Sequence, residues 1–199
     1  MSKERQAGFR IGTVHGRLSA QKQDSEAQLR NELYLIGMLK IEMTQQTSTD
    51  IRLVAYEMPL EAGQPRGSCI DLFGYDQDHN PWLIELKASD SNENMADIVE
   101  QINRYARSFE SIKAAVQAEV CARYHWNGFH FGKETHHMIL AGREFWVRRS
   151  GTIQWPEKIY CCSFARIQSE CNEERVVLLE KNTSGWVGLK IENRAQLVL

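Results

Sequence analysis

The spacing of apolar residues along the chain predicts two helices. The first spans residues 24–43, with Asp24 or Ser25 available to cap its start, and its apolar stripe consists of Leu29, Leu33, Ile36 and Leu39. The second runs from about Met95 to about Ala122 after a polar loop, and its stripe consists of Met95, Ile98, Val99, Ile102, Ala106, Phe109, Ile112 and Val116. Each stripe gives its helix one face that can pack on a sheet.

Short apolar segments bounded by turn residues predict the strands. They fall at residues 51–60, 69–76, 81–88, 135–142, 144–149, 158–167 and 174–182. The order of helix, strands, helix and strands favours an α/β or α+β fold with a mixed central β-sheet flanked by helices. We expect residues 1–22 to form an N-terminal tail or an extra hairpin, and residues 23–199 to form a single domain.

A hairpin at the centre of the chain carries charged residues inside its strands. The turn DQDHNP centres near Asp78, and pairing residues whose numbers add up to 156 places Asp71 directly opposite Glu85. Lys87 then lies on the same face. The other face is wholly apolar and comprises Ile70, Leu72, Trp82, Ile84 and Leu86. A slip of one residue would mix the two faces, so the pattern favours this register.

Two opposed carboxylates destabilise a sheet unless a positive charge offsets their repulsion. Lys87 offsets part of it, and a divalent cation would offset more. Mg²⁺ is commonly held by one or two carboxylates with water and phosphate oxygens completing its shell, and the Leu86 carbonyl could add an oxygen. The pair Asp71 and Glu85 therefore predicts a metal site. A metal-free cluster of surface ion pairs is the alternative left open.

Net charge and cysteine content refine this interpretation. The net charge is −2, but residues 51–100 carry three basic and ten acidic residues, whereas residues 101–150 carry eight basic and four acidic ones. An acidic segment beside a basic one suits a metal centre flanked by an anion-binding surface. The five cysteines contain no CxxC pair, which favours reduced thiols in a cytoplasmic protein, with zinc at Cys161, Cys162, Cys171 and a histidine as the alternative.

No apolar run approaches 18 residues, and the start MSKERQAGFR lacks the apolar core of a signal peptide. We therefore expect no membrane partner.

The segment IDLFGYDQDHNPWLIELK resembles the core motif of the PD-(D/E)XK nuclease superfamily. Asp71 matches the first acid, Glu85 and Lys87 match the (D/E)xK element, and Ile70 stands in place of the proline. The resemblance covers residues from about 24 to 145. It implies a restriction-endonuclease-like core and a metal-dependent nuclease that hydrolyses DNA phosphodiester bonds with Mg²⁺, for which Mn²⁺ can substitute.

The resemblance also implies roles for residues on both helices. The superfamily places an acid on the first helix, for which we favour Glu32 over Glu26, so that the expected metal ligands are Glu32, Asp71 and Glu85. The spacing of Gln101 and Tyr105 resembles the QxxxY motif of the RecB-like branch. The expected catalytic residues are accordingly Asp71, Glu85, Lys87, Gln101 and Tyr105.

DNA is the expected partner, with Arg104 and Arg107 on the second helix steadying its phosphate backbone. RNA remains open as a substrate, as do a homodimer and the choice between endonuclease and exonuclease. The rival hypothesis is a nuclease-fold module that binds nucleic acid or a protein without cutting. Glu57 is a candidate ligand or, as we favour, an ordinary strand residue.

Overall fold

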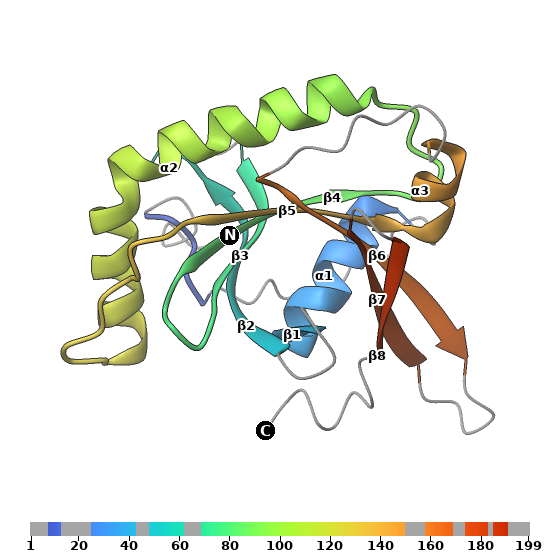
Figure 1. The fold of residues 1–199 in the computed structure, drawn as a ribbon. Helices are drawn as coiled ribbons and strands as arrows, with labels where there is room; N and C mark the ends of the chain where they lie inside the picture. The colour runs from blue at the N-terminus through green and yellow to red at the C-terminus, as the bar shows by residue number, and fades with distance from the viewer. Residues whose placement is uncertain are drawn as a thin grey trace.

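The chain builds one sheet of eight strands, each paired with its neighbour in sequence (Figure 1). The computed structural model describes residues 8–12, 25–42, 48–61, 69–149, 158–168, 174–182 and 185–190. The strands are β1 (Met38–Glu42), β2 (Ser48–Pro59), β3 (Cys69–Tyr75), β4 (Pro81–Lys87), β5 (His136–Gly142), β6 (Tyr160–Gln168), β7 (Glu174–Asn182) and β8 (Gly185–Lys190). The helices are α1 (Glu26–Ile36), α2 (Met95–Tyr124) and α3 (Arg143–Arg149).

The sheet is mixed. Strands β4, β5 and β6 run parallel to one another, and the other neighbours are antiparallel. Parallel neighbours need a crossover connection, and α2 and α3 provide the two crossovers. The sheet also curls, since β1 approaches β7 and β8. These features confirm an α/β fold with a mixed central sheet flanked by helices.

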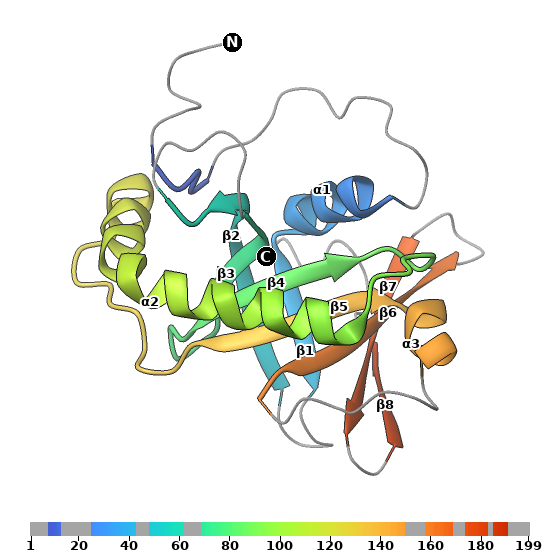
Figure 2. The ribbon, with the colours of Figure 1, turned by 90° about the horizontal axis from the view of Figure 1, so that it is seen from above.

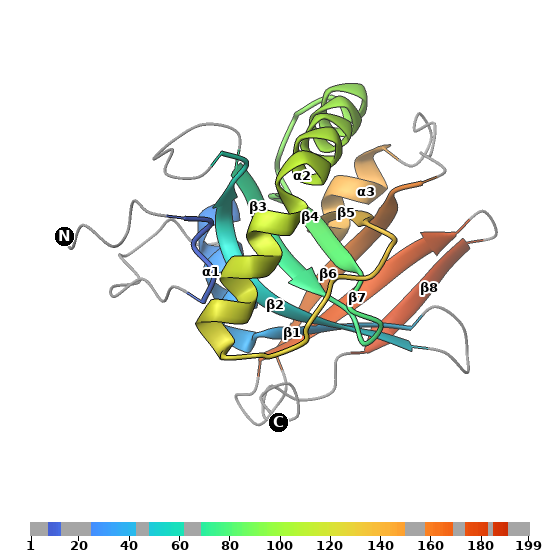
Figure 3. The same cartoon turned by 90° about the vertical axis from the view of Figure 1, so that its left-hand side faces the viewer.

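Helices cover both faces of the sheet, with α1 on one face and α2 and α3 on the other (Figures 2 and 3). The α1 face is buried around Leu29, Leu33, Tyr56, Leu72, Trp82, Ile84, Leu86 and Leu140. The face under α2 and α3 is buried around Met58, Ile70, Phe73, Leu83, Ile98, Ile102, Phe109, Ile139 and Trp146. The strands between the helices are therefore buried on both sides, so any charged side chain there lies in a low-dielectric environment.

Helix α2 is the long element that crosses the sheet. Its start is capped by Asn94, whose side chain accepts a hydrogen bond from the Ala96 N–H, and it ends at His125 in the left-handed conformation. The observed span of Met95–Tyr124 confirms the predicted helix. No helix in the described part of the chain combines the length and the apolar character needed to cross a membrane.

Helix α1 is shorter than the predicted helix of residues 24–43. Ser25 caps its start, as expected, but Gly37 adopts a φ of 78° and donates its N–H to the Leu33 carbonyl, which ends the helix. Glycine adopts this left-handed conformation without the steric penalty of a Cβ atom. The next residues form β1 instead of a further helical turn.

In the second half of the chain, one predicted strand was wrong and one observed strand was not predicted. The segment 144–149, predicted as a strand, lies in α3. Adjacent Phe145 and Trp146 both pack into one cluster, and Arg149 lies over the Phe145 ring one helical turn away. A strand would send neighbouring side chains to opposite faces. Strand β8 was not predicted, whereas β7 matches the predicted 174–182.

Most of the N-terminal segment 1–22, predicted as a tail or an extra hairpin, lies outside the described residues. The described turn at residues 8–12 packs Phe9 and Ile11 into the cluster under α2. The N–H groups of Phe9 and Ile11 both donate to the Glu119 carboxylate on α2, which fixes the turn against that helix.

Candidate metal centre

The hairpin β3–β4 has the predicted register over its outer part. Tyr75 pairs with Pro81, and the ladder continues to Leu72 opposite Ile84, as the sum of 156 predicts. The ladder ends there, so Asp71 and Glu85 are not a ladder pair. Instead, Asp71 Oδ2 accepts the N–H of Leu86 at 2.9 Å. A carboxylate thus takes the position of a strand carbonyl, and the two strands diverge where the charged residues begin.

The backbones of β2 and β3 are irregular near the point where β3 and β4 diverge. Ile70 and Leu72 contact opposite cores, although alternation would place them on one face, and this corrects the predicted apolar face that included Ile70. In β2 the same reversal separates Tyr56 from Met58, and Glu57 between them has a φ of +46°. Left-handed geometry is costly for a residue with a side chain. The sheet is therefore locally irregular around Asp71.

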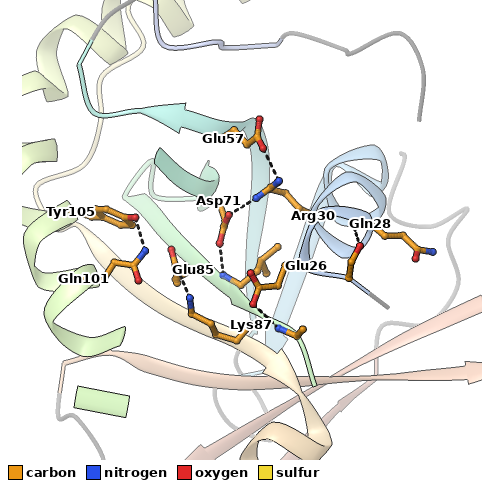
Figure 4. Close-up of polar contacts among 12 residues, drawn as sticks. Glu26, Gln28, Arg30, Glu57, Asp71, Glu85, Lys87, Gln101 and Tyr105 are labelled. Atoms are coloured by element: carbon orange, nitrogen blue, oxygen red, sulfur yellow. Dashed lines mark hydrogen bonds and ion pairs between the residues drawn. The ribbon is translucent and has the colours of Figure 1, made fainter. Parts of the chain in front are cut away.

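Arg30 of α1 bridges Asp71 and Glu57 (Figure 4). Its Nη1 lies 2.6 Å from Asp71 Oδ1, and its Nη2 lies 2.6 Å from Glu57 Oε1. The ladder pairs on either side place Glu57 opposite Asp71 across β2 and β3. On the far side of Glu57, Arg10 donates to the Glu57 carbonyl at 2.9 Å. These contacts hold Glu57 in its unusual conformation.

Glu85 and Lys87 form a buried pair on β4. The Lys87 ammonium lies 2.9 Å from Glu85 Oε1 and 2.7 Å from Glu93 Oε2 in the loop before α2. The side chains of Glu85 and Lys87 are only 4% and 6% exposed. Glu85 Oε2 is buried and has no hydrogen-bond partner among the residues that the structure describes. A buried carboxylate oxygen without a partner is costly, and within the described residues neither a cation nor a donor satisfies this atom.

Burial and the neighbouring carboxylates disfavour the ionised form of Glu85. Burial, and after it the Asp71 carboxylate, raise the pKa of Glu85 from 4.5 to about 8, although Lys87 opposes the rise. Burial alone would lower the pKa of Lys87, but Glu85 and Glu93 outweigh it and leave that pKa raised. Lys87 therefore stays charged, and an added positive charge would stabilise the ionised form of Glu85.

Gln101 and Tyr105 lie together on the side of α2 that faces this site (Figure 4). The Gln101 amide donates to the Tyr105 hydroxyl at 2.6 Å. Burial is the main cause that raises the pKa of Tyr105, and the Glu85 and Asp71 carboxylates raise it further, so the hydroxyl lies within electrostatic reach of both acids. The predicted pair Gln101 and Tyr105 therefore lies near the predicted acids Asp71 and Glu85.

The structure places Glu26, and not the favoured Glu32, beside the site. The Glu26 carboxylate accepts the N–H of Ala88, directly after β4, and is one of the groups that raise the pKa of Glu85. Glu32 instead accepts a hydrogen bond from Gln28 at 2.8 Å. Glu26 and Arg30 are four residues apart and so share a helix face, whereas Glu32 lies about 120° around the helix from Glu26.

Arg104 and Arg107 stay on the exposed side of α2. The Arg104 guanidinium lies 5.8 Å from the centre of the Tyr105 ring, which places it next to the QxxxY pair. Arg107 lies one turn further along the helix. Both arginines are exposed, so both are accessible to a ligand that approaches α2 from solvent.

The oxygen set fits Mg²⁺ held by a pair of carboxylates. Glu85 Oε2 offers a free, buried ligand atom, and Asp71 keeps unused lone pairs beside its two hydrogen bonds. Within the described ranges, no group of three histidine, cysteine or acidic side chains is arranged around one position. Mg²⁺ commonly uses only one or two carboxylates and completes its shell with water and phosphate oxygens.

The zinc alternative is not supported. Cys161 and Cys162 contribute to opposite cores, so they cannot share one ion, and Cys171 lies outside the described residues. The four described cysteines form no disulfide with one another.

Sequence reasoning missed Arg30, Glu93 and Asp76. Arg30 could have been noticed, because it follows Glu26 by four residues on the face that must meet the strands. Asp76 is buried in the hairpin turn, where its carboxylate accepts hydrogen bonds from the Asn80 N–H and the Trp82 indole. Asp76 therefore explains why the turn keeps its predicted register.

Comparison with known proteins yields no relative: no family model, no curated protein and no solved structure matches the chain.

Proposed function

We propose that this protein is a Mg²⁺-dependent nuclease that hydrolyses DNA phosphodiester bonds, with a restriction-endonuclease-like core of the PD-(D/E)XK type and a RecB-like QxxxY pair. The observation that carries the proposal is the buried, unpartnered Oε2 of Glu85 beside Asp71 and Lys87. A purely structural ion-pair cluster would satisfy this oxygen from within the chain.

Asp71 and Glu85 would hold the cation, with Mn²⁺ able to replace Mg²⁺. When bound, such an ion lowers the pKa of water and neutralises a phosphate oxygen. Lys87 is a charged donor at the same place, because Glu85 and Glu93 keep its ammonium protonated. A charged donor beside the cation orients a water molecule and offsets the negative charge that develops on the oxygens of the scissile phosphate in the transition state.

The α2 face would bind the substrate. The Gln101 amide and the Tyr105 hydroxyl lie near the two acids and can donate to a phosphate oxygen. Arg104 and Arg107 on the exposed side of the helix add positive charge along a phosphate backbone. DNA is proposed on the superfamily resemblance, and RNA of the same sequence belongs in the assay as a competing substrate.

Incubation of the full chain with linear and circular DNA in Mg²⁺, Mn²⁺ or EDTA tests the proposal. We expect cleavage with either metal and none with EDTA. Asp71→Asn and Lys87→Met should each lose most of the rate, because removing one member of a group that acts as a unit abolishes most of its effect. Asp78→Asn is the matched control, because Asp78 is exposed in the turn.

The non-cleaving module makes a different prediction in the same experiment. Such a protein would bind DNA or RNA with or without Mg²⁺ and leave it intact. Binding without any metal-dependent cleavage by the wild-type chain would therefore replace the nuclease proposal by the module.

A further inference from the structure

Arg30 occupies the space between two acids, where a cation would otherwise be needed. Its guanidinium contacts the Asp71 and Glu57 carboxylates at 2.6 Å each, and its side chain is 16% exposed. Both contacts are short charge-assisted hydrogen bonds, which are among the strongest that a side chain makes. Arg10 holds Glu57 from the other side, with 3.6 Å between its Nη1 and Glu57 Oε2.

Three acids follow one another across neighbouring strands. Glu57 on β2 lies opposite Asp71 on β3, and Glu85 on β4 lies beyond Asp71. Three carboxylates in a row offer two positions for a cation, one on each side of Asp71. Arg30 fills the position between Glu57 and Asp71, whereas on the other side of Asp71 the described residues leave the buried Oε2 of Glu85 without a partner.

We propose that Arg30 is a fixed cation that takes the place of a second metal ion, so that the centre binds a single divalent cation. This inference rests on the proposed function, because it assumes that Asp71 and Glu85 bind a metal. Arg30 acts here as a positioning residue for the two acids that it bridges.

The charge balance of the cluster agrees with one ion. Its carboxylates are Glu26, Glu57, Asp71, Glu85 and Glu93, and its cations are Arg10, Arg30 and Lys87. With Glu85 ionised, as it must be to bind a cation, five negative and three positive charges leave −2, which one divalent ion neutralises. A second divalent ion would leave an excess of +2 in a largely buried cluster, where uncompensated charge is costly.

Calorimetric titration of the metal-free full chain with Mn²⁺ measures the number of ions directly. We expect one ion in the wild type and two in Arg30→Met, because the variant exposes the Glu57–Asp71 pair without its cation. The double variant Arg30→Met with Glu57→Gln should return to one ion. Arg52→Met is the control, since Arg52 lies over Trp126 away from the acids, and it should keep one.

Electron paramagnetic resonance gives a second reading of the same question. Two Mn²⁺ ions that share Asp71 should give the spectrum of a coupled pair in Arg30→Met, whereas the wild type should give that of an isolated ion. Arg30→Gln provides a second variant if Arg30→Met does not fold, because the amide can still donate to Asp71 while the charge is removed.

The outcomes separate this inference from the proposed function. A wild type that binds no Mn²⁺ refutes the metal centre and the inference with it. Two ions in the wild type, or one ion in both uncharged Arg30 variants, refute the fixed cation alone and leave the nuclease proposal intact.

Discussion

Replacing Glu85 by glutamine should remove a pH-dependent loss of stability from the metal-free protein. The pKa of Glu85 is raised from 4.5 to about 8 by burial and by Asp71. A raised pKa means that the folded state binds the proton more tightly than the unfolded state does. The contribution of Glu85 to stability is therefore complete below pH 4.5 and is lost as the pH rises toward 8.

The size of the effect follows from the shift. Each unit of pH between the two pKa values removes about 1.4 kcal/mol, so that roughly 3 kcal/mol is lost between pH 4.5 and pH 7. The side chain is 4% exposed, so solvent does little to reduce this figure. Glutamine keeps the shape and the acceptor for Lys87 but carries no titrating proton.

Urea unfolding in EDTA from pH 4.5 to pH 8 measures this difference. We expect the free energy of unfolding of the wild type to fall relative to that of Glu85→Gln by roughly 3 kcal/mol up to pH 7. Mg²⁺ should recover most of the loss in the wild type, because it favours the ionised carboxylate. Parallel curves for the two proteins would show that the pKa of Glu85 is not raised in the folded state. Asp78→Asn should follow the wild type.

Two further substitutions test other parts of the account. Tyr105→Phe keeps the buried ring and removes the hydroxyl bonded to Gln101. DNA cleavage should therefore slow about tenfold to hundredfold, with little change in melting temperature. Cleavage at the wild-type rate would mean that Gln101 and Tyr105 serve only in packing the helix. A Cβ atom at Gly74 would overlap the Arg52 carbonyl in the neighbouring strand, so Gly74→Ala should lower the free energy of unfolding by about 1–3 kcal/mol in a urea titration. Gly128→Ala meets no neighbouring atom, although its φ is positive, and should cost less, about 1 kcal/mol; an equal cost at both positions would contradict the steric argument.

The hairpin and α2 were predictable because local rules decide them. The turn at Asp78 and the alternation on both strands fixed the register from Tyr75–Pro81 to Leu72–Ile84. The apolar stripe of α2 likewise predicted which residues lie on the sheet, and Ile98, Ile102 and Phe109 are buried as expected. In both cases the signal is a periodicity that one segment carries by itself.

The rest depends on contacts between segments that are distant in sequence. Alternation extended past Leu72 would pair Asp71 with Glu85, but the Arg30 guanidinium and the Leu86 N–H hold the Asp71 carboxylate instead. Glu26 and Glu32 are equivalent in a helix taken alone, and only the position of α1 against the end of β4 distinguishes them. The end of α1 at Gly37 was a local signal that the prediction passed over.

We propose that Asp71, Glu85 and Lys87 form a cation centre that cleaves DNA, and Lys87→Met separates cation binding from cleavage at that centre. Lys87 contacts the two carboxylates Glu85 and Glu93 and is not itself a metal ligand. Mn²⁺ binding by calorimetry and DNA cleavage should therefore be measured on the same preparation of this variant. We expect the variant still to bind Mn²⁺ while cleavage falls to the level seen with EDTA. Cleavage at the wild-type rate by folded, Mn²⁺-bound Lys87→Met would contradict it.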